Sequence, residues 1–158
     1  LAVKAATSAP TEGRALYAAL QALPVPEEPV ARLWHAATLL REHRGDGHNA
    51  ALVTEGIGGT EAHVLHALFE GIPAASFGRV HHLPPARLAA VVDGMHARGL
   101  IDASGWLSDA GRETKERIES LTDDLAAAAY ASLEPSELDQ LIADLGPISA
   151  AVDATGSR

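Results

Sequence analysis

A helix followed at once by a tight turn is the feature that most constrains the fold of this chain. Pro84 and Pro85 start the helix, and Gly99 ends it. Between them the apolar side chains recur at helical spacing, at Leu88, Val91, Val92 and Met95. The turn-forming run Asp102–Gly105 then separates two short apolar pieces, Leu100-Ile101 and Trp106-Leu107. This pattern predicts a minimal two-stranded β-hairpin directly after the helix.

The rest of the sequence indicates further helices that are separated by proline and glycine. We expect them over residues 12–23, 29–44, 48–55, 60–70, 109–129 and 135–152. The run Gly45-Asp46-Gly47 is typical of a turn, and it sets the break between the second and third of these helices. Ser108 is expected to cap the helix that begins at Asp109. The predicted fold class is therefore mostly α.

Composition excludes several classes of protein before any motif is considered. The 158 residues include no cysteine, which rules out disulfide frameworks, thiolate metal sites and cysteine nucleophiles. Apolar residues make up 47%, which is too many for a disordered chain. No apolar run approaches the roughly 18 to 20 residues that a membrane span needs. The first ten residues lack the continuous apolar core of a secretory signal, so we expect a cytoplasmic protein without a membrane partner.

Charge is concentrated at one end of the sequence. The formal net charge is -9, and residues 109–158 hold four Lys or Arg against eleven Asp or Glu. Residues 58–107 hold three against four. Because phosphate contact needs a basic face, the whole-chain charge argues against strong nucleic-acid binding. The nearly neutral middle of the chain is still compatible with a DNA surface.

The order of elements around the predicted hairpin resembles that of MarR-type regulators, which are winged helix-turn-helix proteins. Two motifs carry the resemblance, Gly99-Leu100-Ile101 and Leu107-Ser108-Asp109-Ala110-Gly111-Arg112. The resemblance implies a helix-turn-helix and wing over residues 58–107, with the hairpin as the short two-stranded wing. It also implies that the long helices of residues 109–153 form a homodimer interface.

By the same resemblance, the helix after the double proline would be the DNA recognition helix. The side chains that would face double-stranded DNA are Arg79, Arg87, His96 and Arg98. Wings of this family usually carry an Asp-Arg-Arg run, whereas the turn Asp102–Gly105 has no basic side chain. So few phosphate contacts predict weak and strongly salt-dependent binding.

Residues 33–66 resemble an actinobacterial helix-turn-helix family of unassigned activity, and the run 41–48 is the most specific part of the match. Members of that family place an all-helical N-terminal domain before a MarR-like half. The resemblance implies that this chain is the C-terminal half, which agrees with a first residue that is Leu1 rather than Met. We therefore expect an N-terminal arm over residues 1–27 and a MarR-like domain over residues 28–158.

The run 41–48 places six ionisable side chains around two glycines: Arg41, Glu42, His43, Arg44, Asp46 and His48. Arginines can clamp a carboxylate or phosphate, histidines can exchange protons, and glycines allow close approach of a ligand. We interpret the run as a binding site for a small-molecule effector or a site that couples domains. A solvated surface turn and an enzymatic or metal site are the alternatives.

A second cluster lies on the helix expected over residues 60–70. His63, His66 and Glu70 share one face there, which is compatible with metal ligation, although packed histidines have the same spacing. The sequence shows neither a nucleophile elbow nor a phosphate-binding loop, so we predict no catalytic residue, metal or cofactor. The predicted function is a dimeric, ligand-responsive MarR-like transcriptional regulator. The alternative is a winged-helix scaffold that binds or converts a small molecule around residues 41–48.

Overall fold

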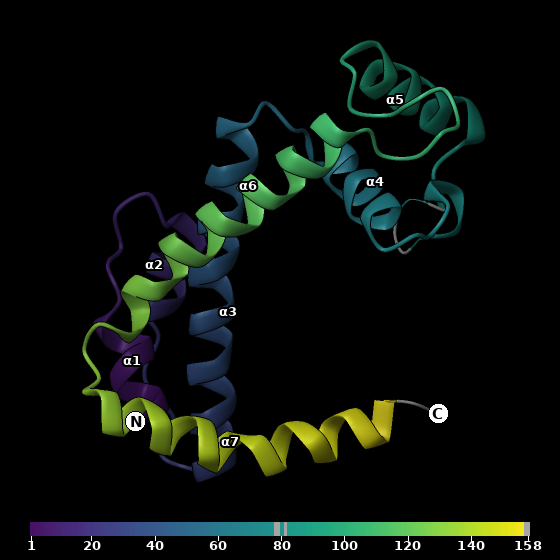
Figure 1. The fold of residues 1–158 in the computed structure, drawn as a ribbon. Coiled ribbons are helices and arrows are strands. Elements are labelled where there is room, and N and C mark those ends of the chain that lie inside the picture. Colours follow the sequence, from purple (N-terminus) through teal and green to yellow (C-terminus); the bar gives the residue numbers. More distant parts are fainter. Residues whose placement is uncertain (78–79, 81, 157–158) are drawn as a thin grey trace. The chain divides into compact units, whose positions relative to one another are not determined.

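The chain folds into helices in a computed structural model that describes residues 1–77, 80 and 82–156 (Figure 1). The α-helices are α1 (Ala2–Ser8), α2 (Ala15–Gln21), α3 (Pro29–Thr54), α4 (Gly59–Phe69), α5 (Pro85–Ala97), α6 (Asp109–Ala127) and α7 (Pro135–Gly156). Short 3₁₀ helices include η1 (Ala74–Ser76) and η3 (Ala128–Tyr130). Within the described ranges no residue lies in a β-strand, and no helix is both long and apolar enough to cross a bilayer. The prediction of a mostly α fold is confirmed.

Contacts divide the chain into two compact units. Unit 1 consists of Leu1–Gly47 and Asp124–Arg158, and unit 2 consists of His48–Asp123. Unit 1 therefore combines α1, α2 and most of α3 with the end of α6 and α7, whereas unit 2 holds the end of α3, α4, α5 and the first part of α6. The division between an arm of residues 1–27 and a domain of residues 28–158 stays a prediction.

The core of unit 1 is built mostly from alanines around one tyrosine. Its buried members are Ala6, Ala9, Tyr17, Ala36, Leu39 and Ala129. Tyr17 is completely buried, and its hydroxyl lies 2.8 Å from the carbonyl oxygen of Ala6. The small side chains of this core lie in or directly after α1, in α3 and in η3, and α1 packs against η3. The sequence did not predict α1, and the helix expected over residues 12–23 is shortened to α2.

The predicted turn at residues 45–47 is wrong, because α3 continues without a break through both glycines. A glycine inside a helix costs roughly 0.5 to 1 kcal/mol relative to alanine, so tertiary contacts must compensate. Gly47 is buried under the Arg14 guanidinium, where a Cβ atom would lie 2.5 Å from Nη1. Asp46 accepts hydrogen bonds from backbone amides at the start of α2. Both contacts need helical geometry at this point of α3.

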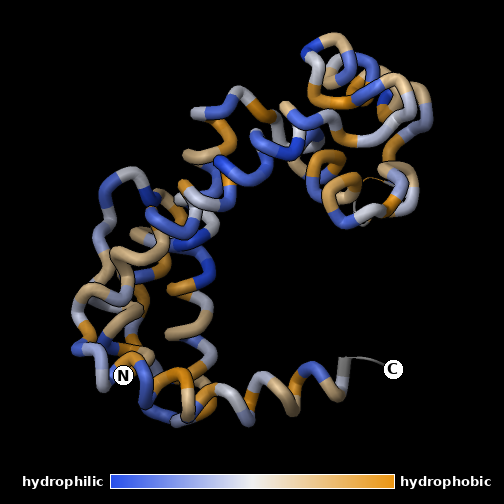
Figure 2. The backbone as a smooth tube through the Cα atoms, in the orientation of Figure 1, coloured by the Kyte–Doolittle hydropathy of each residue, from blue (hydrophilic) through white to orange (hydrophobic). Residues whose placement is uncertain are grey.

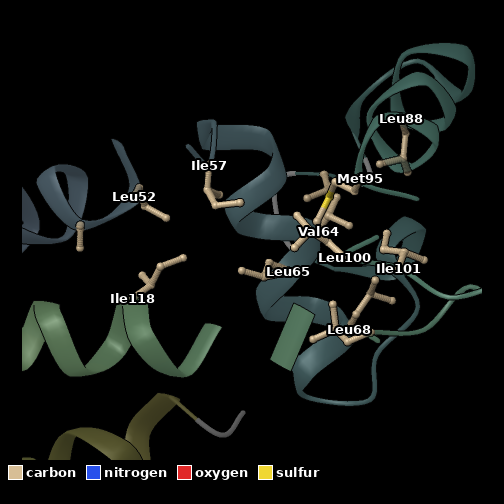
Figure 3. Packing of buried hydrophobic residues seen from close by; sticks show 13 residues of the cluster. Leu52, Ile57, Val64, Leu65, Leu68, Leu88, Met95, Leu100, Ile101 and Ile118 are labelled. Atoms are coloured by element: carbon tan, nitrogen blue, oxygen red, sulfur yellow. The ribbon is translucent and has the colours of Figure 1, made fainter. Parts of the chain in front are cut away.

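The core of unit 2 joins the end of α3 to α4, α5 and α6 (Figure 3). Deeply buried members come from each of these helices, and Figure 3 shows the side chains of Val64 and Met95 close together. Val64 and Met95 are completely buried, while Leu65 and Ile118 are 1% exposed. Burial of each such side chain contributes about 1.5 to 3 kcal/mol, which fixes α5 with one face inward.

The predicted two-stranded wing is wrong, although the turn itself is confirmed. Ile101 and Leu107 form a single antiparallel bridge, and the Asp102 carboxylate accepts hydrogen bonds from Ser104 and Trp106 across the turn. Only two residues on each side of the turn are available for pairing. Gly99 ends α5 before them, with a φ of 77°, and the residues after Leu107 already belong to the start of α6. The chain is therefore too short for strands.

Both ends of this connection match the sequence-based expectation. The Ser108 hydroxyl accepts a hydrogen bond from the backbone amide of Gly111 at 3.0 Å, so Ser108 caps α6 as predicted. The same hydroxyl donates to the carbonyl oxygen of Gly99. Gly111 lies against the backbone carbonyl of Leu100, where any Cβ atom would overlap the oxygen. This close approach holds the turn against the first turn of α6.

Candidate nucleic-acid interface

One face of α5 is packed in unit 2, and the opposite face is open to solvent. Leu88 and Met95 point into the core. The exposed residues are mostly small: Ala86, Arg87, Ala89, Ala90, Asp93, Gly94, His96 and Ala97. A surface of this kind lets a helix backbone approach a partner closely, and it presents few charges to that partner.

The predicted DNA-contacting residues of α5 do not form one row. Successive residues of an α-helix are about 100° apart, so Arg87 and Arg98 fall on one flank of the exposed face. His96 falls on the opposite flank. Asp93 lies near the middle of the exposed face, among alanines. The centre of the face is therefore uncharged except for one carboxylate, and the positive groups border it.

Arg87 and His96 are exposed, and neither side chain forms an ion pair or hydrogen bond with any residue in the described part of the chain. Both side chains are therefore available to a partner. Arg87 lies in the first turn of α5 and carries a permanent positive charge, which suits contact with a phosphate. The fourth predicted residue, Arg79, lies outside the described residues.

Arg98 has a structural partner instead. Its guanidinium donates a 2.9 Å hydrogen bond to the Glu61 carboxylate of α4 and another of 2.9 Å to the carbonyl oxygen of Gly56. Glu61 also accepts a hydrogen bond from the backbone amide of Gly58 at 2.8 Å, which caps α4. The pair thus ties the end of α5 to the start of α4. Arg98 was assigned to DNA from the sequence because Glu61 lies 37 residues away, and no local pattern reveals that the two side chains pair.

Residues 41–48 lie inside α3, where neighbouring side chains point in different directions. Arg41 is 75% exposed and pairs with Glu42, whereas the side chain of His43 is buried. Asp46 caps α2, and the Nδ1 atom of His48 lies 3.0 Å from the Thr122 hydroxyl. Arg44 is exposed and also has an interaction partner. This distribution gives several of the six residues structural tasks, and their effector role stays a prediction.

Arg14 organises the buried part of this region, and sequence reasoning missed it because nothing local distinguishes it. It is only 7% exposed. Its guanidinium donates hydrogen bonds to the carbonyl oxygens of His43 and Leu125, the latter at 2.8 Å. Burial and the nearby Arg14 charge lower the pKa of His43, while the Asp46 charge opposes them. The imidazole is therefore held in its neutral form.

The alternative of a metal site gains no support from the structure. Among the residues it describes, no three His, Asp or Glu side chains are placed so that they could hold a metal ion. His66 instead packs edge-on against the ring of Phe77, with ring centroids 5.1 Å apart. A packed histidine is the simpler explanation of its position on α4.

The model of a helix-turn-helix family matches residues 1–157, which is nearly the whole chain. No curated protein and no solved structure is significantly similar.

Proposed function

The chain belongs to a helix-turn-helix family, and from this premise we propose that unit 2 binds double-stranded DNA through α5. The proposal rests on one observation: one face of α5 is buried in the core of unit 2, and the opposite face is exposed to solvent. Leu88 and Met95 hold α5 in the core, and its small outer residues permit close approach to a groove. Arg87 and His96 are free to contact phosphates at the borders of that face.

The charge of unit 2 sets the expected strength of binding. Residues 48–123 contain six Lys or Arg against ten Asp or Glu, and Glu61 already neutralises Arg98. The turn at Asp102–Gly105, which resembles a wing only in position, adds no positive charge. Each phosphate contact contributes about -0.9 to the slope of log affinity against log salt. We therefore expect weak binding with a shallow salt slope, in place of the strong salt dependence expected from the sequence, because few phosphates are contacted.

We propose further that the protein acts as a dimeric transcriptional regulator. Dimeric helix-turn-helix proteins bind two half-sites with two equivalent recognition helices. An unpartnered apolar surface on α7 supports a second copy as partner, because Ile142, Ile148 and Val152 are 63%, 47% and 62% exposed. Figure 2 shows hydrophobic residues recurring along this helix. Next to it lies an apolar hollow of about 530 Å³, lined by Ala127, Tyr130, Ala131, Leu138, Leu141, Ile142 and Leu145.

Fluorescence anisotropy of a labelled random-sequence duplex, measured between about 50 and 200 mM salt, tests the DNA proposal. The wild-type chain is expected to bind at low salt and to lose affinity as salt rises. Arg87→Ala should weaken binding and reduce the salt slope by about one. Arg32→Ala is the matched control, because it removes an exposed arginine of unit 1 and should leave the slope unchanged. Binding with no salt dependence, or equal effects of both substitutions, contradicts the proposal.

A further inference from the structure

His43 is a buried histidine whose ring has no polar partner. It is 1% exposed, and neither Nδ1 nor Nε2 has a hydrogen-bond partner in the described residues. The rings of His43 and Tyr17 pack edge to face, with their centroids 5.0 Å apart and an angle of 84° between their planes. This contact joins α3 to α2. The imidazole therefore acts as an apolar packing group as long as it stays neutral.

The charged groups around this ring come from two helices. At the N-terminus of α2, the buried Arg14 guanidinium donates to the backbone carbonyl of His43 itself and reaches Leu125 at the end of α6. On α3, the Asp46 carboxylate is engaged by the amides of Leu16 and Tyr17. A proton on His43 would place a second cation beside Arg14 in a region that water does not reach. Such a charge is costly to bury without a partner of its own.

We propose that His43 is an acid-sensitive switch in unit 1, in which protonation of the buried imidazole releases α2 from α3. The inference is independent of DNA binding, since every group involved belongs to unit 1. It gives His43 a role that differs from both earlier interpretations of the charged run 41–48, the effector site and the surface turn.

The direction of the effect follows from proton linkage. The folded state lowers the pKa of His43 from its ordinary value of 6.5, because burial and Arg14 disfavour the charged form. The released state then binds the proton more readily than the packed state, so stability falls as pH falls below 6.5. Between pH 6.5 and the lowered pKa, the equilibrium constant for release of α2 should rise by up to tenfold for each unit by which the pH falls. Well above pH 6.5 the imidazole is neutral in both states, and the switch has no effect.

Hydrogen exchange of the full chain, measured by mass spectrometry and corrected for the intrinsic pH dependence of exchange, tests the proposal. As pH falls from neutral to mildly acidic, α2 peptides of the wild-type chain should lose protection before peptides of α4 and α5 do. His43→Phe keeps an aromatic ring against Tyr17 and removes the titrating group, so it should abolish this early loss. His35→Gln is the matched control, because His35 is the other histidine of unit 1 and lies on the same helix. It should keep the acid response.

A second measurement decides the question if His43→Phe does not fold. In the native wild-type chain, the imidazole proton resonances of His43 should show no titration while exchange protection of α2 persists. Titration of His43 near its ordinary value, with α2 still protected, overturns the proposal. The proposal also fails if His35→Gln removes the acid response or if His43→Phe retains it.

Discussion

The Asp46 carboxylate on α3 accepts a hydrogen bond from the backbone amide of Tyr17 at 3.0 Å, so one helix caps the start of another. The amide of Leu16 donates to the same oxygen at 3.0 Å. These are orphan donors of the first turn of α2, which has no capping side chain at Arg14, the residue before it. Capping from a different helix makes the stability of α2 depend on the tertiary structure of unit 1.

Replacing Asp46 with alanine should therefore destabilise unit 1 by about 1 to 2 kcal/mol, the usual cost of losing a helix cap. Urea denaturation followed by circular dichroism measures the loss. Asp139→Ala is the control, since Asp139 is exposed on α7 and its side chain has no hydrogen bond or ion pair with a described residue. Equal stability of the two variants would show that the contact with α2 contributes nothing.

A side chain at position 111 should destabilise unit 2 for a steric reason. Alanine at this position would drive its Cβ atom into the carbonyl oxygen of Leu100, which is backbone and cannot simply rotate away. We expect a loss of roughly 1 to 3 kcal/mol, as for other overpacked sites. Gly94→Ala on α5 meets no atom of another element within 4 Å and should stabilise the chain by about 0.5 to 1 kcal/mol. Thermal unfolding of both variants distinguishes the two signs, and destabilisation of similar size in both would contradict the steric argument.

Local signals predicted the elements that depend on neighbouring residues. Pro85 at the start of α5, Gly99 after its end and Ser108 as the cap of α6 all act within a few residues of their own position. The continuity of α3 could not be predicted in the same way. The residues that support it, Arg14 and Tyr17, are about thirty positions away in the sequence. Gly45 and Gly47 thus have the composition of a turn but the environment of a helix.

In the candidate site, too, the sequence predicted what depends on nearby residues and missed what depends on packing between helices. Exposure of Arg87 and His96 follows from the apolar pattern of α5, and the structure has them exposed. The engagement of Arg98 with Glu61 and the burial of His43 depend on packing between helices, which a sequence pattern does not report. Charged residues close together in sequence were therefore a poor guide to which of them share a surface.

Asp93 offers a direct test of how α5 meets DNA. Its carboxylate lies near the centre of the exposed face, where it would repel phosphates and reduce the affinity. Asp93→Asn should therefore tighten binding to a random duplex by roughly 0.5 kcal/mol, about two- to threefold, at low salt. Asp139→Asn makes the same charge change in unit 1 and should have little effect. If both variants bind equally tightly, only the net charge matters and α5 is not the contact surface.

The exposed apolar side chains of α7 predict the oligomeric state. Ile142 is 63% exposed and also lines the hollow beside α7, so a second copy that covers this helix would bury it. Ile142→Glu would place a charge in that interface, and we expect the dimer to dissociate at concentrations where the wild type is associated. Val53→Glu is the control, because Val53 is 78% exposed but belongs to unit 2. Sedimentation velocity measures the mass of each species. A monomeric wild type, or a dimer that survives Ile142→Glu, would exclude α7 as the dimer interface.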